Sequence, residues 1–304
     1  MKTRFAECIF FGLVFLTGSS IFAQTERSSS VLVTVTVTDI YGRWISGLEQ
    51  GDIKIFEGKQ AKEIRSFSKN GDPVSIGIVV DRSGSASSLP YKKIDIPLSL
   101  FLHRANHKNE YFVMAFNEKQ RLVSDWTPDY SVVDKKLDEL DAIEPKGNTK
   151  FFDAVSLAVD KVNTAQNTRK ALLIISDGQD NGSDHRLSEI KDKLKRSNIT
   201  VYCVSPALPA DVGNPLGMMG QLNLDSLIQL TGGKSFYPFP NELNQVIFRI
   251  AEELDYQYIL EIDPSTQDGK WREIDVRLTV PDEMKKIGRL TVRSRKGYFA
   301  EKTK

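Results

Sequence analysis

Two continuous, largely apolar segments, each ending at an aspartate, constrain the fold of this chain more than any other feature. The first covers residues 74–80 and is followed by Asp81, and the second covers residues 170–176 and is followed by Asp177. Continuous apolarity is typical of central strands in a parallel sheet that is covered on both faces. Because parallel strands end at the same edge of their sheet, the two aspartates are expected at one edge.

The rest of residues 72–254 alternates between strand and helix patterns. Besides the two central strands, strands are expected at residues 110–116, 121–126, 199–205 and 234–237. Helices are expected at about residues 90–105, 131–140, 151–162, 187–196, 221–230 and 240–254. This alternation predicts an α/β fold with a doubly wound, mostly parallel sheet, and the short link between residues 116 and 121 predicts one antiparallel edge strand.

The two flanks of this region have β patterns instead. Residues 24–71 hold an alternating Val/Thr strand at 31–38 and further strands at 53–56 and 61–67. Residues 255–304 hold alternating strands at 256–262, 271–280 and 289–294. Because each flank is too short to bury a good core alone, we expect both flanks to pack together as a small antiparallel support domain.

The first 23 residues have the pattern of a secretory signal peptide. Lys2 and Arg4 precede an apolar run from Ile9 to Leu16, and small residues lead to Ala23. The run is too short to span a bilayer, which favours a signal peptide over a membrane anchor or a buried helix. We therefore expect an exported protein, located in the periplasm or outside the cell.

Composition excludes several classes of protein. The 41 Lys and Arg residues balance 40 Asp and Glu residues, so the net charge of +1 gives no basis for nucleic acid as a partner. The two cysteines, Cys8 and Cys203, are too few for a disulfide framework or a multi-cysteine zinc site. After removal of the signal peptide only Cys203 would remain, within an apolar strand, where we expect it to be buried.

Oxygen-bearing side chains follow the two central strands and precede a helix between them. Asp81, Ser83 and Ser85 form a D-x-S-x-S pattern, Asp177 follows the later strand, and Thr149 stands before the helix at 151–162. Alternate spacing lets one tight loop direct the first three side chains inward. Hydroxyl and carboxylate oxygens suit a hard divalent cation such as Mg²⁺, so these five residues are the candidate metal ligands.

This set of motifs resembles the von Willebrand factor type A domain over about residues 72–254. The resemblance implies a metal-ion-dependent adhesion site, in which the two serines and the threonine bind Mg²⁺ (or Mn²⁺) directly and the aspartates bind directly or through water. It further implies an open coordination position that accepts an acidic residue of a protein partner. The flanks are similar to those of exported bacterial proteins with this domain.

Three other interpretations fit parts of this sequence less well. The D-x-S-x-S pattern could be a helix N-cap cluster, although Thr149 and Asp177 make that reading weaker. A phosphotransferase with an aspartate nucleophile usually has a second acidic residue two positions later, where this chain has Ser83. The spacing of His103 and His107 can hold zinc, but no H-E-x-x-H pattern is present.

The sequence therefore predicts a binding module and not an enzyme. We expect metal-dependent recognition of a protein that offers an acidic residue, as in cell adhesion, with no small-molecule substrate. The alternative is a structural or assembly module of the cell envelope in which the metal only stabilises the loops. Asp153, four residues after Thr149, could orient the site from behind or simply pack and cap its helix.

Overall fold

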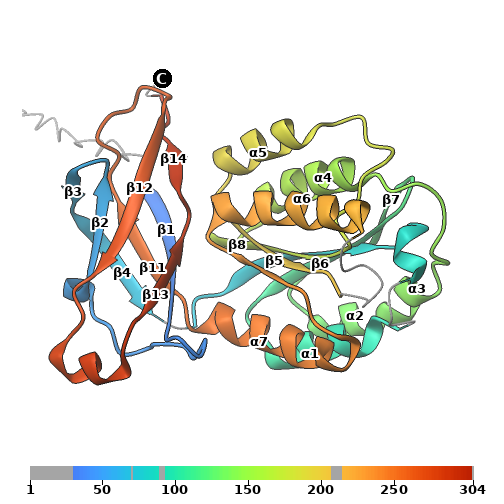
Figure 1. The fold of residues 1–304 in the computed structure, drawn as a ribbon, viewed down its shortest axis with the longest axis horizontal. Coiled ribbons are helices and arrows are strands. Elements are labelled where there is room, and N and C mark those ends of the chain that lie inside the picture. The colour runs from blue at the N-terminus through green and yellow to red at the C-terminus, as the bar shows by residue number, and fades with distance from the viewer. Residues whose placement is uncertain (1–29, 70, 89–92, 207–213, 303–304) are drawn as a thin grey trace, which may run out of the picture.

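The computed structural model describes residues 30–69, 71–88, 93–206 and 214–302. The expected signal peptide lies outside these residues. The described chain forms an α/β unit and a β unit that lie side by side (Figure 1). Within the described ranges, no helix has both the length and the apolarity needed to cross a membrane.

The α/β unit is built on a six-stranded sheet with the order β10-β9-β8-β5-β6-β7. Its strands are β5 (Val74–Asp81), β6 (Glu110–Phe116), β7 (Gln120–Thr127), β8 (Arg169–Ile175), β9 (Ile199–Val204) and β10 (Lys234–Phe236). Every pairing is parallel except that of β6 with the edge strand β7. The doubly wound fold with one antiparallel edge strand, predicted from the sequence, is confirmed.

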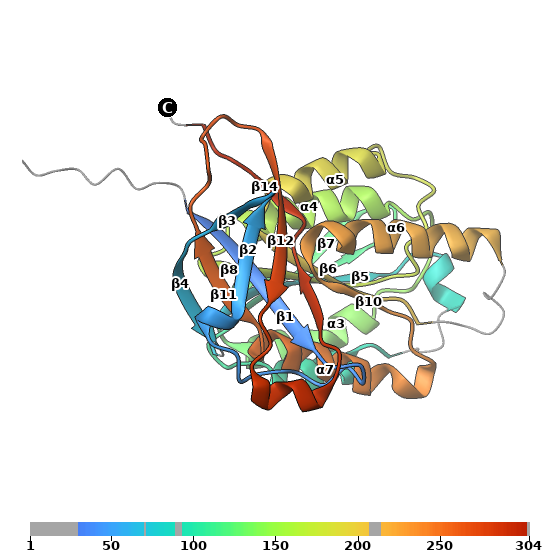
Figure 2. The same cartoon turned by 60° about the vertical axis from the view of Figure 1, so that its left-hand side comes forward.

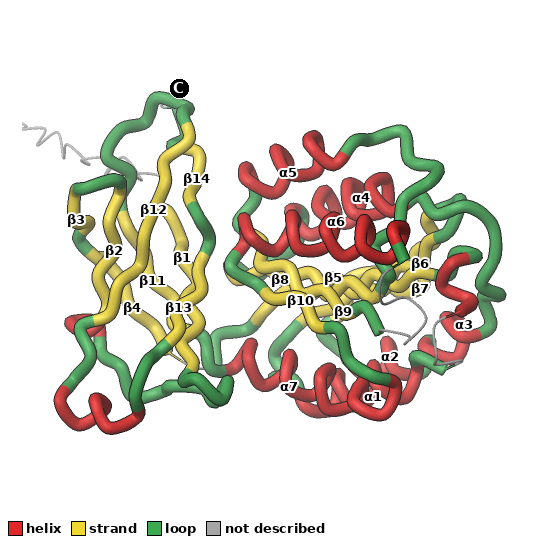
Figure 3. Tube along the Cα trace, viewed as in Figure 1, coloured by secondary structure: helices red, strands yellow, loops and turns green. Residues whose placement is uncertain are grey.

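Helices cover both faces of this sheet (Figure 3). One face is covered by α1 (Asp95–Arg104), α2 (Tyr130–Asp134), α3 (Leu137–Asp141) and α7 (Leu243–Asp255). The other is covered by α4 (Phe151–Asn163), α5 (Leu187–Arg196) and α6 (Pro215–Thr231). All eight residues of β5 are buried, as continuous apolarity indicated. Cys203 on β9 is also fully buried, which raises the pKa of its thiol.

Three predicted helices differ from the observed ones. The helix expected at about 90–105 is α1, which begins only at Asp95, and residues 90–92 of that expectation lie outside the described residues. The helix expected at 221–230 begins earlier, at Pro215, because Asn214 caps it by accepting a hydrogen bond from the Leu216 N–H at 3.1 Å. The helix expected at 131–140 is divided into α2 and α3, which are separated by Lys135 and Lys136.

The β unit is a sandwich of two four-stranded antiparallel sheets, and each sheet combines both flanks of the chain (Figure 2). One sheet has the order β13 (Thr291–Ser294), β1 (Val31–Thr38), β11 (Tyr258–Ile262), β4 (Ile64–Lys69). The other has the order β14 (Gly297–Phe299), β12 (Trp271–Leu278), β2 (Ile53–Glu57), β3 (Gln60–Lys62). The prediction of a single strand at 61–67 is therefore wrong, because the chain passes from one sheet to the other at Glu63.

The two units are joined by a buried polar network around Glu253 on α7, which is 0% exposed. Its carboxylate accepts hydrogen bonds from the Arg293 guanidinium of β13 at 2.6 Å and from the Tyr202 hydroxyl of β9 at 2.9 Å. Gln257 donates to the same Tyr202 hydroxyl at 2.8 Å. Because a buried carboxylate needs a charged partner, Arg293 fixes the sandwich against the α/β unit.

We predict that Arg293→Ala destabilises the protein by about 3 to 5 kcal/mol, because it leaves the Glu253 carboxylate buried without its cation. Arg277→Ala is the control, since the Arg277–Asp275 pair is exposed on both sides and is expected to contribute less than about 1 kcal/mol. Urea unfolding followed by circular dichroism measures both. Equal effects of the two substitutions would contradict the role given to Glu253.

Candidate metal centre

The candidate ligands Asp81, Ser83 and Ser85 form a tight loop at the end of β5. Asp81 is 4% exposed and accepts a hydrogen bond from the Ser83 N–H at 2.9 Å. The Ser83 and Ser85 hydroxyl oxygens lie 3.1 Å apart. Gly84 donates its N–H to the Gly147 carbonyl at 2.9 Å, and a Cβ on Gly84 would lie 3.0 Å from that oxygen. The loop is thus held by its own side chains and by the segment before Thr149.

Thr149 completes the hydroxyl set from the start of α4. Its side-chain oxygen lies 3.5 Å from that of Ser85, and the residue is 1% exposed. Its N–H donates to the Asn181 side-chain oxygen at 2.7 Å, and its carbonyl accepts from the N–H groups of Asn181 and Gly182. The loop after β8 therefore positions Thr149, which the sequence did not indicate.

The same loop caps α4, whose own N-cap residue Lys150 makes no side-chain cap. The Asp180 carboxylate accepts the N–H of Phe152 at 3.1 Å, and the Ser183 hydroxyl accepts the N–H of Asp153 at 3.1 Å. Both groups satisfy N–H donors that a helix start otherwise leaves unpaired. The position of Thr149 therefore depends on the loop that also carries Asp177.

Asp177 stands between β8 and this loop. Its carboxylate accepts the Gln179 N–H at 2.9 Å. The neighbouring Ser176 donates its hydroxyl to the Asp81 carboxylate at 2.6 Å, which links the ends of β8 and β5. Gly178 has a positive φ of 75°, and a Cβ there would lie 2.3 Å from the Gly220 carbonyl of α6. Glycine is therefore required for α6 to approach the centre.

The electrostatics of the centre favour a cation. Burial, together with the charge of Asp177, raises the pKa of Asp81 to about 7. Two carboxylates close enough to repel each other, beside three hydroxyls, are an oxygen set that fits a hard divalent ion. In the described parts of the chain, no three His, Cys, Asp or Glu side chains gather as a metal cluster.

The two histidines considered for zinc both pack against one aromatic ring. His103 and His107 each lie against the Tyr130 ring, with ring centroids 5.2 Å apart in both cases. His103 also lies 3.5 Å from the Asp134 carboxylate. Their positions are explained by packing on α2.

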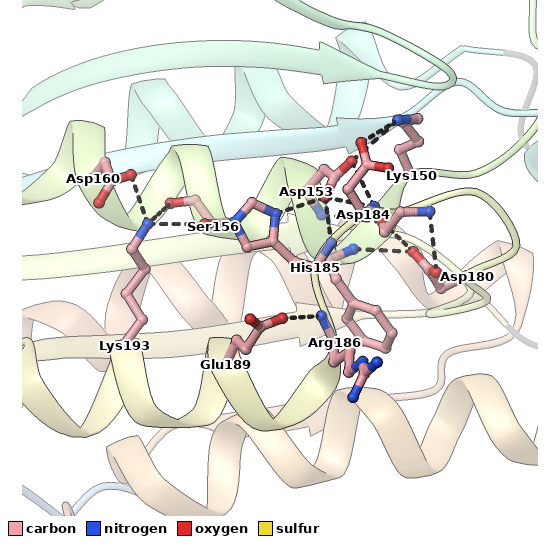
Figure 4. A network of polar contacts seen from close by, with 12 residues as sticks. Lys150, Asp153, Ser156, Asp160, Asp180, Asp184, His185, Arg186, Glu189 and Lys193 are labelled. Atoms are coloured by element: carbon pink, nitrogen blue, oxygen red, sulfur yellow. Dashed lines mark hydrogen bonds and ion pairs between the residues drawn. The ribbon is translucent and has the colours of Figure 1, made fainter.

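Asp153 on α4 holds the loop after β8 (Figure 4). Its carboxylate accepts the N–H groups of Asp184 and His185 and contacts the His185 ring at 2.7 Å and the Lys150 ammonium at 3.4 Å. Burial alone would raise the pKa of Asp153, but the hydrogen bonds from His185, Asp184 and Lys150 lower it to about 2. Asp153 therefore remains ionised and anchors this loop to α4.

A chain of contacts resembling a serine-hydrolase triad runs from Asp153 through His185 to Ser156 (Figure 4). The His185 ring lies 3.4 Å from the Ser156 hydroxyl. However, Ser156 is 4% exposed, and the Lys193 ammonium donates to its hydroxyl oxygen at 2.8 Å. A nucleophile has to reach its substrate, so these contacts indicate a structural clasp between α4 and α5.

We predict that Mg²⁺ binds more weakly as the pH falls below about 7. Without metal, Asp81 in the folded protein keeps its proton between its unfolded pKa of 3.8 and its folded pKa of about 7, whereas in the unfolded chain it has lost it. The bound proton therefore stabilises the folded state, and this stabilisation is lost as the pH rises through that range. Mg²⁺ requires the ionised carboxylate, so affinity should fall up to about tenfold per pH unit below 7. Calorimetry at about pH 6 and about pH 8 measures this; equal affinities at both would contradict it.

We also predict that Asn181→Ala weakens Mg²⁺ binding by about tenfold, because Thr149 loses the hydrogen bond that positions it. Asn163→Ala, at the far end of α4, is the matched control and should leave the affinity unchanged. Circular dichroism confirms that both variants fold. An Asn181→Ala protein with the affinity of the unmodified chain would show that Thr149 is positioned by other contacts.

Comparison with known proteins identifies the family of the α/β unit. The von Willebrand factor type A domain matches residues 75–242. No curated protein sequence matches the chain. Among solved structures, BatB from Bacteroides thetaiotaomicron shares 16% identity and a TM-score of 0.46 over 60% of this chain and 99% of its own.

Two further structures are similar to the chain. The vWF domain of the pilus tip protein Mfa5 from Porphyromonas gingivalis shares 12% identity and a TM-score of 0.46, over 62% of this chain and 96% of its own. A von Willebrand factor type A protein from Catenulispora acidiphila shares 13% identity and a TM-score of 0.48, over 92% of this chain and 75% of its own. With the family match covering more than half of its residues, the chain belongs to the von Willebrand factor type A domain family.

Proposed function

We propose that this chain is an exported, metal-dependent protein-binding module with no enzymatic activity. In this proposal Mg²⁺ or Mn²⁺ binds at the carboxyl edge of the central sheet and accepts a carboxylate from a protein partner. The observation that carries it is the approach of three hydroxyls to two carboxylates where β5 and β8 end. Export is supported by the N-terminal sequence pattern.

The chemistry of the ligand set supports recognition of an acidic group. Ser83, Ser85 and Thr149 would supply neutral oxygens, and Asp81 and Asp177 would balance the two charges of the ion. A divalent ion held largely by neutral oxygens still attracts a further anionic ligand. The partner is therefore proposed to offer an Asp or Glu side chain.

The first turns of α6 supply an apolar surface beside this edge. Met218 and Met219 are 56% and 58% exposed. The helix is tied to the centre because Asn223 donates to the Gly178 carbonyl at 2.9 Å. Exposed methionines on a fixed helix suit contact with a partner surface, so we assign them to the docking surface.

Selection of displayed peptides tests the proposal directly. Peptides are captured on the immobilised protein in millimolar Mg²⁺ and released with EDTA. We expect the recovered peptides to share an Asp or Glu whose replacement by Asn or Gln abolishes binding, and we expect capture to fail on the Thr149→Ala protein. Capture that persists in EDTA or on that variant would contradict the proposal.

The alternative is a structural or assembly module of the cell envelope, in which the metal only stabilises the loops. The same selection distinguishes the two. Under the alternative, Mg²⁺ raises the melting temperature of the protein, but no carboxylate-dependent peptide is recovered.

We predict that Met218→Ser combined with Met219→Ser weakens binding of a selected peptide by roughly tenfold, because two exposed apolar contacts are lost. Mg²⁺ affinity and the melting temperature should not change, since neither side chain is buried. Leu157→Ser, which removes a 47% exposed apolar side chain on α4, is the control. A large fall in melting temperature would show that the methionines support the fold instead.

A further inference from the structure

A second candidate site lies at the opposite edge of the central sheet, between the two units of the molecule. It is a cavity of about 390 Å³. Its walls come from the start of β1, the connection from α4 to β8, the end of α5 and the segment from Arg295 to Glu301. Figure 2 shows β14 beside α5, and the two elements are in contact. The cavity therefore joins the sandwich to the α/β unit.

Cations outnumber anions among the charged side chains that line this cavity. The four cations are Lys170, Lys195, Arg196 and Arg295, and Glu301 is the one acidic residue among the lining residues. Lys195 pairs with Asp192 at 3.5 Å. Within the described residues, no carboxylate lies within ion-pair distance of the other three cations.

Arg295 is the least exposed of these cations, at 9%. Its guanidinium donates to the Asn198 side-chain oxygen at 2.8 Å, to the Gly297 carbonyl at 2.6 Å and to the Lys195 carbonyl at 3.2 Å. All three acceptors are neutral, and the guanidinium has five N–H groups. Burial lowers the pKa of Arg295 to about 10, which reflects a charge without a counter-ion.

In the part of the chain that the structure describes, Lys170 and Arg196 also lack a carboxylate within ion-pair distance, although Lys170 is half-buried and Arg196 is exposed. The Lys170 ammonium donates to the Asn163 carbonyl at 3.1 Å, and burial lowers its pKa, which the charge of Glu110 partly offsets. The Arg196 guanidinium lies 4.2 Å from the centre of the Phe299 ring. The carbonyl ends of α4 and α5 contribute only about half a negative charge each. With Glu301 included, positive charge still exceeds negative charge around the cavity.

We propose that this cavity binds a small anionic ligand that carries phosphate or carboxylate groups. The volume of the cavity lies within the range of ligand pockets, and it is larger than one phosphate requires. Arg295 would provide a buried, preformed donor, and Lys170 and Arg196 would close around the anion from the α/β unit. Because its walls come from both units, the bound ligand would hold them together. This site is independent of the metal centre at the other edge.

Calorimetry with two defined anions tests this proposal. Pyrophosphate and citrate are titrated into the full chain in metal-depleted buffer, because both anions bind Mg²⁺, and glucose serves as the neutral control. We expect saturable binding of at least one anion and none of glucose. The stronger of the two anions distinguishes a phosphate ligand from a carboxylate ligand.

Substitutions then locate the binding. Lys170→Met and Arg196→Gln should each weaken it about tenfold, because each removes a charged contact. Lys285→Gln, on an exposed segment away from the cavity, and Asp81→Asn at the metal centre should leave it unchanged. Neither Lys170 nor Arg196 is buried, so both variants should fold even if Arg295→Met does not.

Three results would overturn the proposal. The first is no saturable heat for either anion up to about 10 mM. The second is unchanged affinity in both cavity variants, which would mean that these cations only balance the partial negative charge at the carbonyl ends of α4 and α5. The third is loss of binding in Asp81→Asn, which would place the anion elsewhere.

Discussion

The pairing of β5 with β8 is the constraint on which the rest of the structure depends. These two adjacent parallel strands end together, which brings Asp81 and Asp177 to one edge of the sheet. Burial of Asp81 raises its pKa, and the charge of Asp177 adds to this effect, so that the pKa reaches about 7. The fold therefore creates an electrostatic cost at this edge, which the proposed divalent cation would relieve.

The loops around this edge depend on one another. The segment after β8 fixes Thr149 through Asn181 and caps α4 through Asp180. Gly84 binds the backbone of Gly147, which ties the loop after β5 to the approach to α4. Three connections that are distant in sequence are thus braced as one unit, so that a substitution in one is expected to move ligands carried by another.

The sandwich gives this unit a fixed support. Each of its sheets contains strands from both flanks, so neither flank can form it alone. The contact with the α/β unit includes the buried pair Glu253–Arg293 at one place and the cationic cavity at another. The relative position of the two units is therefore set partly by charge.

Much of the fold could be predicted because local patterns determine it. Continuous apolarity marked β5 and β8, and strict Val/Thr alternation marked β1. The start of α6 was missed although Asn214 and Pro215 are typical of a helix N-terminus. The division between β3 and β4 was missed because a strand that changes sheets keeps its apolar pattern.

These local patterns could not predict contacts between segments that are distant in the sequence. The cap that Asp180 provides for α4 joins residues 28 positions apart, and no sequence spacing indicates it. The Arg295 guanidinium donates to the neutral side chain of Asn198, which is 97 positions away in the sequence. The five candidate ligands could be named because each follows a strand or precedes a helix, but the residues that position them could not.

Diffraction from crystals soaked in Mn²⁺ tests the central claim most directly, because the anomalous signal of the ion locates it without assumption. We expect one strong peak among the side-chain oxygens of Ser83, Ser85 and Thr149, which disappears in the Asp81→Asn protein. A well-ordered loop with no peak there at saturating Mn²⁺, or a peak held by other residues, would contradict it.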